Sequence, residues 1–154
     1  MVEEEHDHTF EDMVQMVGMR LETEMFGVDI MKVQEIIRVQ EVTRVPRTEN
    51  YVRGVVNLRG KVIPVISLRE RFSFPAPEGD GREARIMIVN TLVGTVGFEV
   101  DAVTEVFRLP KSSIVPPPPT AARLDSEYIV GVGTLNGKLL VVLNLDRLLS
   151  GREE

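Results

Sequence analysis

Residues 54–72 read GVVNLRGKVIPVISLRERF, and residues 131–149 read GVGTLNGKLLVVLNLDRLL. Seven of the nineteen aligned positions are identical. In each stretch, two short apolar runs flank a dipeptide that ends in glycine, Arg59-Gly60 or Asn136-Gly137. This pattern predicts two strands joined by a tight hairpin, and Asn-Gly is the pair that best tolerates the positive φ angles of a type I′ turn. The fold is therefore decided by a hairpin that occurs twice.

The repeat extends upstream of each hairpin. Residues 26–46 read FGVDIMKVQEIIRVQEVTRVP and residues 96–116 read VGFEVDAVTEVFRLPKSSIVP, with Glu35 and Glu105 at equivalent positions. The second copy is seven residues longer between its two matching segments, and we assign the surplus to residues 116–126, which hold four consecutive prolines. A stiff spacer is the favoured interpretation of these prolines, and a polyproline II ligand for an SH3-type partner is the alternative.

Strand-forming runs occupy most of the remaining chain. Alternating or β-branched patterns predict further strands at residues 14–21, 25–29, 34–39, 85–90, 95–100 and 105–109. Short helical turns are predicted at residues 49–53, 68–72 and 145–149. Residues 10–17 also fit a helix face, so their state stays open. Pro64 has no N–H to donate, which predicts an edge strand or a bulge at that point.

The composition indicates one folded domain. The chain has 154 residues, 43% of them hydrophobic and 27% charged, and it contains no cysteine. A repeated strand-rich unit of this size predicts two small barrels that pack against each other over an apolar seam, because neither would bury much core alone. The copies cover about residues 26–72 and 96–149, with an N-terminal strand and residues 84–95 completing the barrels. We expect residues 1–11 to be an unstructured acidic tail.

No catalytic or metal-binding constellation emerges from the residues. The only histidines, His6 and His8, lie in the acidic N-terminal stretch, where a weak metal site is the less favoured interpretation. The familiar triads therefore lack a base, and there is no phosphate-binding loop. We expect neither enzyme activity nor a cofactor. No apolar run is long enough to span a bilayer, and the N-terminus is unlike a signal peptide, so we expect an intracellular protein.

The residues from 28 to 72 resemble the family of the chemotaxis coupling protein CheW. The resemblance rests on three motifs in order, VQEI at 33–36, TRVP at 43–46 and GVVNLRGKVIPVISLR at 54–69. The second half also looks like the family, and the resemblance covers roughly residues 12–150. It implies a mainly β fold of two intertwined, SH3-like, five-stranded barrels with short helical turns and a hydrophobic core between them.

The resemblance also implies a function without chemistry of its own. Proteins of this family bridge the cytoplasmic tip of chemoreceptors (methyl-accepting chemotaxis proteins) to the regulatory domain of the histidine kinase CheA. We therefore expect a cytoplasmic adaptor that is recruited to membrane-associated receptor arrays, without direct membrane insertion. CheV proteins and the regulatory domain of the kinase share the fold, but no kinase core or receiver domain accompanies this domain here, so a stand-alone coupler is expected.

A rival from another class is a small β-barrel that binds a ligand or an oligonucleotide. Its only support is the basic span 32–71, which carries nine bases against four acids. The whole chain has a formal net charge of −6, and few aromatic residues lie among these bases, so no nucleic-acid partner is expected.

Family positions transfer onto this chain residue by residue. Glu35 and Arg59 match an acidic and a basic position that resemble an ion-paired couple, and the pair acts either in receptor binding or only in supporting the fold. The receptor-facing positions also include Ile30, Val33, Ile36, Asn57, Leu58, Val103 and Val106. The kinase-facing positions are Val42, Thr43, Arg44 and Val45, on a strand of the first barrel, with Lys61 and Ile63 as possible neighbours.

Overall fold

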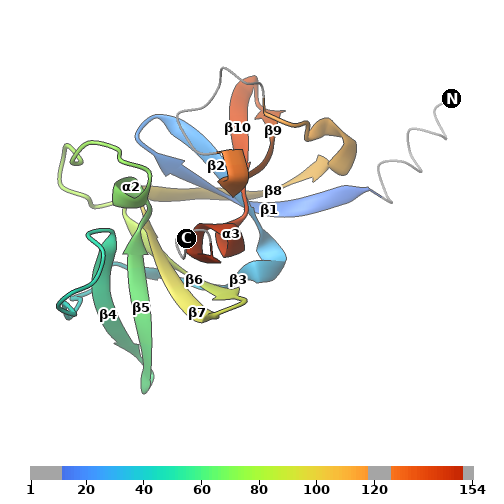
Figure 1. Cartoon of the computed structure of the whole chain (residues 1–154). Helices are drawn as coiled ribbons and strands as arrows, with labels where there is room; N and C mark the ends of the chain where they lie inside the picture. Colours follow the sequence, from blue (N-terminus) through green and yellow to red (C-terminus); the bar gives the residue numbers. More distant parts are fainter. Residues whose placement is uncertain (1–11, 118–125, 151–154) are drawn as a thin grey trace, which may run out of the picture.

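The computed structural model describes residues 12–117 and 126–150 of the chain. Ten strands dominate this part of the chain, and the helices are short (Figure 1). The strands are β1 (Met13–Leu21), β2 (Glu24–Asp29), β3 (Val33–Arg38), β4 (Val52–Leu58), β5 (Lys61–Ser67), β6 (Arg85–Thr91), β7 (Gly94–Val100), β8 (Ala102–Pro110), β9 (Ile129–Leu135) and β10 (Lys138–Leu143). The helices are α2 (Leu68–Arg71), α3 (Leu145–Ser150), and the 3₁₀ turns η1 (Ile30–Lys32), η2 (Lys111–Ser113) and η3 (Ser126–Tyr128).

The strands form two five-stranded sheets, and each sheet takes strands from both copies of the repeat. One sheet has the order β8-β1-β2-β10-β9, and the other has the order β3-β6-β7-β5-β4. The chain crosses between the sheets at η1, after β2, and again between β7 and β8 (Figure 1). We name the two sheets barrel A (with β1 and β2) and barrel B (with β3 to β7). The predicted fold class, two intertwined five-stranded units, is confirmed.

The two hairpins at the centre of the repeat have the predicted turns. Leu58 pairs with Lys61 in the antiparallel ladder, which leaves a two-residue loop at Arg59-Gly60. Both loop residues have positive φ, 52° and 87°, and Asn136-Gly137 has the same pattern with 54° and 79°. Two central residues with positive φ are characteristic of the type I′ turn, whose twist matches that of the flanking strands.

Within the described residues, an isolated bridge between the outer elements closes each sheet. In barrel B, Thr43 pairs with Val55 of β4, and in barrel A, Val115 pairs with Val132 of β9. The sequence alignment of the repeat matches Val115 with Val45 rather than with Thr43. The prediction that the whole length difference falls after residue 116 is therefore wrong, because η2 already lengthens the second copy before this bridge.

The closing bridge of barrel B depends on a glycine. Gly54 has φ 141°, and a Cβ atom at this position would lie 2.1 Å from the carbonyl oxygen of Thr43. Gly131 occupies the equivalent place in barrel A, where a Cβ atom would lie 2.7 Å from the carbonyl oxygen of Val115. Both glycines therefore let the closing segment approach the edge strand closely.

The apolar side chains form one core in each barrel and a larger core between the barrels. Along β6, Ile86 and Ile88 point into barrel B, whereas Met87 and Val89 belong to the shared core. The alternation follows from the two-residue period of a strand that is buried on both faces. The shared core joins both barrels and both short helices; it includes Val17, Met19, Leu21, Phe26, Val28, Ile66, Leu68, Phe72, Met87, Val89, Phe98, Val100, Leu143, Leu145 and Leu148. The predicted apolar seam is confirmed.

Three local predictions are settled by the fold. The ambiguous segment is a strand from Met13 onward, and its residues 10 and 11 lie outside the described residues. The helical turn predicted at 49–53 is wrong, because one turn closed by Val52 N–H to the Glu49 carbonyl (3.0 Å) leads directly into β4. Pro64 is not on an edge strand, but the parallel ladder of β5 with β7 begins only at the next residue, so no bond is lost at Pro64.

Candidate functional site

Glu35 and Arg59 form an ion pair across the two edges of barrel B. Glu35 lies on β3, at one edge of the sheet, and Arg59 lies in the turn between β5 and the opposite edge strand β4. The side chain of Arg59 is 67% exposed and that of Glu35 is 28% exposed. The pair therefore faces water, where it adds little to stability but is accessible to a partner.

The turn fixes where the guanidinium of Arg59 can go. Arg59 adopts a left-handed conformation, and the side-chain oxygen of Asn57 accepts a hydrogen bond from the N–H of Gly60 (2.9 Å). A polar side chain that bonds its own turn in this way makes the local backbone rigid. Asn57 therefore acts on the position of Arg59 and remains exposed beside it.

The other predicted receptor residues divide into exposed and supporting ones. Ile36 and Val106 are 39% and 51% exposed, and they can touch a partner. Ile30, Val33 and Val103 are only partly buried and pack against the shared core, where the chain crosses between the barrels. Leu58 packs against the core of barrel B. The structure thus brings Glu35 and Asn57–Arg59 together on barrel B. Ile36 follows Glu35 in β3 but points to the other face of the strand, and Val103 and Val106 lie on β8 of barrel A.

The predicted kinase-facing residues need two corrections. Residues 42–45 do not form a strand, because only Thr43 takes part in a bridge. Val42 packs against the core of barrel B, and Ile63 is 2% exposed inside the same core, so Ile63 cannot contact a partner. Val45 is 39% exposed, and Arg44 and Lys61 are exposed as well. The sequence pattern misplaced Ile63 because alternation alone does not tell which face of a strand is outside.

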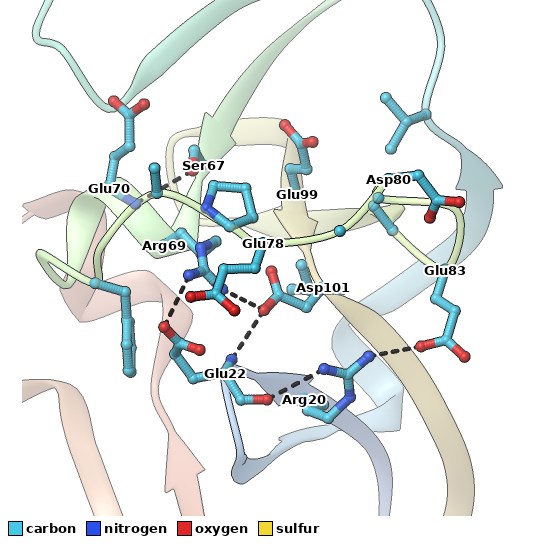
Figure 2. A pocket seen from close by; sticks show the side chains of 18 of the residues that line it. Arg20, Glu22, Ser67, Arg69, Glu70, Glu78, Asp80, Glu83, Glu99 and Asp101 are labelled. Atoms are coloured by element: carbon cyan, nitrogen blue, oxygen red, sulfur yellow. Dashed lines mark hydrogen bonds and ion pairs between the residues drawn. The ribbon is translucent and has the colours of Figure 1, made fainter.

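A network around Arg69 was not predicted from the sequence. Arg69 of α2 has a side chain only 9% exposed, and its guanidinium contacts the carboxylates of Asp101 (2.5 Å) and Glu22 (3.0 Å), as Figure 2 shows. It also donates to the carbonyl oxygen of Pro75 from Nη2 (2.6 Å) and Nε (3.1 Å). Asp101 in turn accepts from the N–H of Glu22 (2.8 Å). We call this network the Arg69 brace.

The Arg69 brace connects the two barrels. Arg69 follows β5 of barrel B, Glu22 lies in the turn between β1 and β2 of barrel A, and Asp101 marks the crossing from β7 to β8. Beside it lies a hollow of about 880 Å³ with a mixed acidic and basic lining, roofed by residues 74–84. Within this hollow Arg20 pairs with Glu83 (2.7 Å) and Arg53 with Glu99 (2.8 Å). Burial, the largest influence, raises the pKa of Glu99 despite the nearby charge of Arg53.

A second brace occupies the equivalent place in the other half, with its charges reversed. Asp146 of α3 is the repeat counterpart of Arg69. Its carboxylate accepts from Lys32 Nζ (2.8 Å) and from the N–H of Leu92 (2.9 Å). Lys32 lies at the crossing from β2 to β3, and Leu92 lies in the turn between β6 and β7. We call this contact the Asp146 brace; it joins the same kinds of element as the Arg69 brace does.

The Asp146 brace shifts the ionisation of both partners. Burial opposes ionisation of Asp146, but the hydrogen bonds from Lys32 and from the Leu92 N–H, with the charge of Lys32, lower its pKa below the ordinary value. The hydrogen bond with Asp146 and then its charge raise the pKa of Lys32. Because the folded state favours the ionised form of Asp146, the brace stabilises the fold above the unfolded pKa and loses this effect as the pH falls through the folded pKa.

We expect an Asp146→Asn variant to reveal this dependence. Near pH 7 it should melt below the parent protein, and the difference should shrink as the pH falls through the lowered pKa of folded Asp146, where the parent loses its ionised carboxylate as well. Thermal melts between pH 7 and pH 3 measure the difference. Glu41→Gln, at an exposed position, is the control and should show a small, constant difference. A difference for Asp146→Asn that does not change with pH would contradict the role of its ionised form.

The two tyrosines of the chain also meet at a basic residue. Tyr51 and Tyr128 are equivalent in the repeat, and the guanidinium of Arg71 lies 5.1 Å from the first ring and 4.7 Å from the second. Arg71 also donates to the hydroxyl oxygen of Tyr128 (2.5 Å). Such cation–π contacts stabilise packing between elements.

The basic span that supported a nucleic-acid partner is partly neutralised in the fold, because four of its nine bases pair with carboxylates. Lys32, Arg53, Arg59 and Arg69 all pair with carboxylates, and Arg71 lies between the tyrosines. Nucleic-acid binding needs such side chains to be available for phosphates. This arrangement therefore argues against that alternative.

Neither a metal site nor a membrane-spanning helix occurs within residues 12–117 and 126–150. No cluster of three potential metal-ligating side chains occurs there. No helix in the described part of the chain is long and apolar enough to cross a membrane. His6, His8 and the last two prolines of the run lie outside the described residues, so the predictions about them stay predictions.

Two interlaced barrels with an exposed ion pair and apolar neighbours define an interaction domain, and comparisons with known proteins specify which one. The CheW-like domain family matches residues 15–153. The chain is 37% identical to chemotaxis protein CheW of Klebsiella aerogenes, covering 86% of this chain and 80% of that protein. It is 34% identical to CheW of Helicobacter pylori (90% and 83%) and 31% identical to protein FrzA of Myxococcus xanthus (80% and 77%).

A solved structure agrees with these sequence matches. The crystal structure of the scaffolding protein TtCheW from Thermoanaerobacter tengcongensis superposes with a TM-score of 0.81 at 36% identity, covering 88% of this chain and 86% of that chain. The chain belongs to the CheW-like domain family. Its function class is that of a chemotaxis scaffold adaptor.

Proposed function

We propose that this protein bridges the cytoplasmic tip of a chemoreceptor to the regulatory domain of the CheA histidine kinase, and that it has no catalytic activity of its own. The observation that carries the proposal is the solvent-accessible Glu35–Arg59 pair, with Ile36 exposed at the next position of β3. Charged anchors next to apolar side chains suit a helical partner that offers both kinds of contact. On this proposal the protein is cytoplasmic and joins receptor arrays through its partners.

The receptor arm is tested by removing the ion pair. Because Arg59 is 67% exposed and Glu35 is partly exposed, Glu35→Ala and Arg59→Ala should each cost about 0–1 kcal/mol of stability. Receptor binding should nonetheless fall by about 10-fold or more, since each truncation leaves the other charge unpaired when the partner covers it. Thermal melts and pull-down with a soluble receptor signalling fragment measure the two quantities.

The double variant separates the two roles of the pair. If the pair acts as a unit at the interface, Glu35→Ala with Arg59→Ala should bind no worse than either single variant. A large loss of melting temperature with normal receptor binding by the folded fraction would instead assign the pair to the fold alone.

The proposed contact with the kinase is better tested at Val45 than at Val42. Val42 packs on the core, so an acidic replacement there would destabilise barrel B as well as any interface. Val45 is exposed, and Val45→Glu should weaken binding to the kinase regulatory domain by about 10-fold, or about 1.4 kcal/mol, with an unchanged melt. Unchanged binding in calorimetry would remove residues 42–45 from the kinase surface.

A further inference from the structure

The two braces sit in equivalent surroundings that differ in chemistry. Around the Arg69 brace the repeat places Glu22, Thr23, Arg53 and Asp101, which are charged or polar. Their counterparts around the Asp146 brace are all apolar and exposed: Leu92 (87%), Val93 (68%), Val130 (55%) and Met31 (83%). We call these four residues the α3 patch.

The members of the α3 patch gather round one ion pair. Met31 adjoins Lys32, whose Nζ lies 2.8 Å from the Asp146 carboxylate, and the N–H of Leu92 binds the same carboxylate. Val130 lines a hollow of about 250 Å³ together with Lys32 and Asp146. Scattered single apolar residues are normal at a protein surface, but a contiguous group at one place indicates an interaction site.

In the other half of the molecule, a segment of the chain covers the site that is equivalent to the α3 patch. There, residues 74–84 run over the hollow beside α2 (Figure 2). The segment inserts Phe74, which is 6% exposed, offers the Pro75 carbonyl to Arg69, and pairs Glu83 with Arg20. It therefore combines an apolar anchor with charges opposite to those of the site. Residues 151–154, which follow α3, carry no apolar side chain and do not match this role.

The charges of the α3 patch favour a basic and apolar occupant. Asp29 and Asp146 outnumber Lys32, so the rim carries one net negative charge. A partner that covers the α3 patch as residues 74–84 cover the other half should bring apolar side chains together with a lysine or arginine. Its charge would be opposite to that of residues 74–84, which are mainly acidic.

The patch is continuous with the surface assigned to the receptor. Met31 stands in η1 between Ile30 and Val33, two of the predicted receptor residues. The hollow also includes Val89, which pairs with Val33 in the ladder between β3 and β6. A rod-shaped partner that lies along β3 at Glu35 would therefore continue over Met31 toward Leu92 and Val93.

We propose that the α3 patch is a second contact area for the chemoreceptor tip, which places apolar side chains against Met31, Leu92, Val93 and Val130 and a basic side chain near Asp146. The inference rests on the proposed receptor-binding function. It adds to the Glu35–Arg59 site a contact area that begins at η1, the crossing from β2 to β3.

Because the chain has no cysteine, a single introduced thiol can report contact directly. Val93→Cys places it in the patch, and Leu139→Cys places it at the far end of β10, at an exposed position (57%) outside the patch. A soluble receptor signalling fragment should slow maleimide labelling of Val93→Cys at least 5-fold and leave Leu139→Cys unchanged. The CheA regulatory domain should not protect Val93→Cys.

A matched pair of acidic variants supplies the energetic test. Leu92→Glu should weaken receptor binding about 10-fold, with an unchanged melt and unchanged kinase binding, whereas Leu139→Glu should bind within 2-fold of the parent. Unprotected Val93→Cys together with normal binding by Leu92→Glu overturns the inference, and so does protection by the kinase domain instead of the receptor. If Glu35→Ala still loses receptor binding in that case, the proposed function survives; if the parent binds no receptor fragment, the proposed function itself fails.

Discussion

Replacing Arg69 with methionine should lower the melting temperature on the order of 10 °C. The substitution leaves the Asp101 carboxylate, only 17% exposed, without its cationic partner, and it removes two bonds to the Pro75 carbonyl. Breaking a buried ion pair from one side costs roughly 3–5 kcal/mol, and each kcal/mol shifts the melting temperature by about 2–4 °C at this chain length. Methionine retains most of the apolar length of arginine, so the loss reports the charge rather than a cavity.

Arg82→Met provides the matched control. Arg82 pairs with Asp80 within the same roofing segment, but both side chains are exposed, 86% and 65%. An exposed pair of this kind contributes about 0–1 kcal/mol, so the melting temperature should hardly move. Equal melting temperatures for Arg69→Met and Arg82→Met would show that the Arg69 brace does not hold the barrels together.

Gly54→Ala should have a comparable or larger effect on barrel B. The added methyl group would lie 2.1 Å from the carbonyl oxygen of Thr43, and the residue would have to keep φ 141°. Backbone strain of this kind costs about 1–3 kcal/mol by itself, and the contact with a backbone atom can be relieved only by moving the closing segment. The bridge between Thr43 and Val55 should therefore open, which hydrogen exchange at the Thr43 and Val55 amides would detect.

Gly60→Ala separates strain from steric contact. Gly60 has φ 87°, but a Cβ atom there would meet no atom within 4 Å. Gly60→Ala should therefore lose stability only through backbone strain, and its melting temperature should lie between those of Gly54→Ala and the parent. Because the closing segment carries Thr43 and Val45, only Gly54→Ala should also weaken kinase binding. Similar melting temperatures for the two variants would mean that the closing segment around Thr43 moves away from the added methyl group without loss of stability.

The repeat made most of the local structure predictable. Turn chemistry at Asn136-Gly137 and apolar runs beside it depend on neighbouring residues only, so the hairpins were predicted correctly. The interlacing of the copies was available only from the family resemblance, because nothing in the alternation of β1 tells whether it pairs with β3 or β8. The helical turn at 49–53 failed for a related reason: the ladder of β4 begins at Val52 and overrides the local preference.

Residues of the candidate site were predictable where a charged side chain interrupts an apolar run. They were not predictable where only the packing of the fold determines which side of a strand is buried. Glu35 and Arg59 are polar residues within apolar runs, and the expected pairing of their side chains is confirmed. Ile63 could not be placed because inward and outward positions of β5 are both apolar. The Arg69 and Asp146 braces could not be predicted from the identical residues of the repeat, because their signal is a reversal of charge at one aligned position.

The interlaced strand order also has a consequence for the order in which the protein is made. β1 pairs with β8, from Met13 beside Pro110 to Arg20 beside Ala102, so β1 is synthesised about 80 residues before its outer neighbour exists. Until then the β1–β2 hairpin exposes two unpaired edges and the apolar side chains of the shared core. Contacts this distant in sequence slow folding, and a chain with unpaired strand edges and exposed apolar side chains is prone to aggregate until both barrels close.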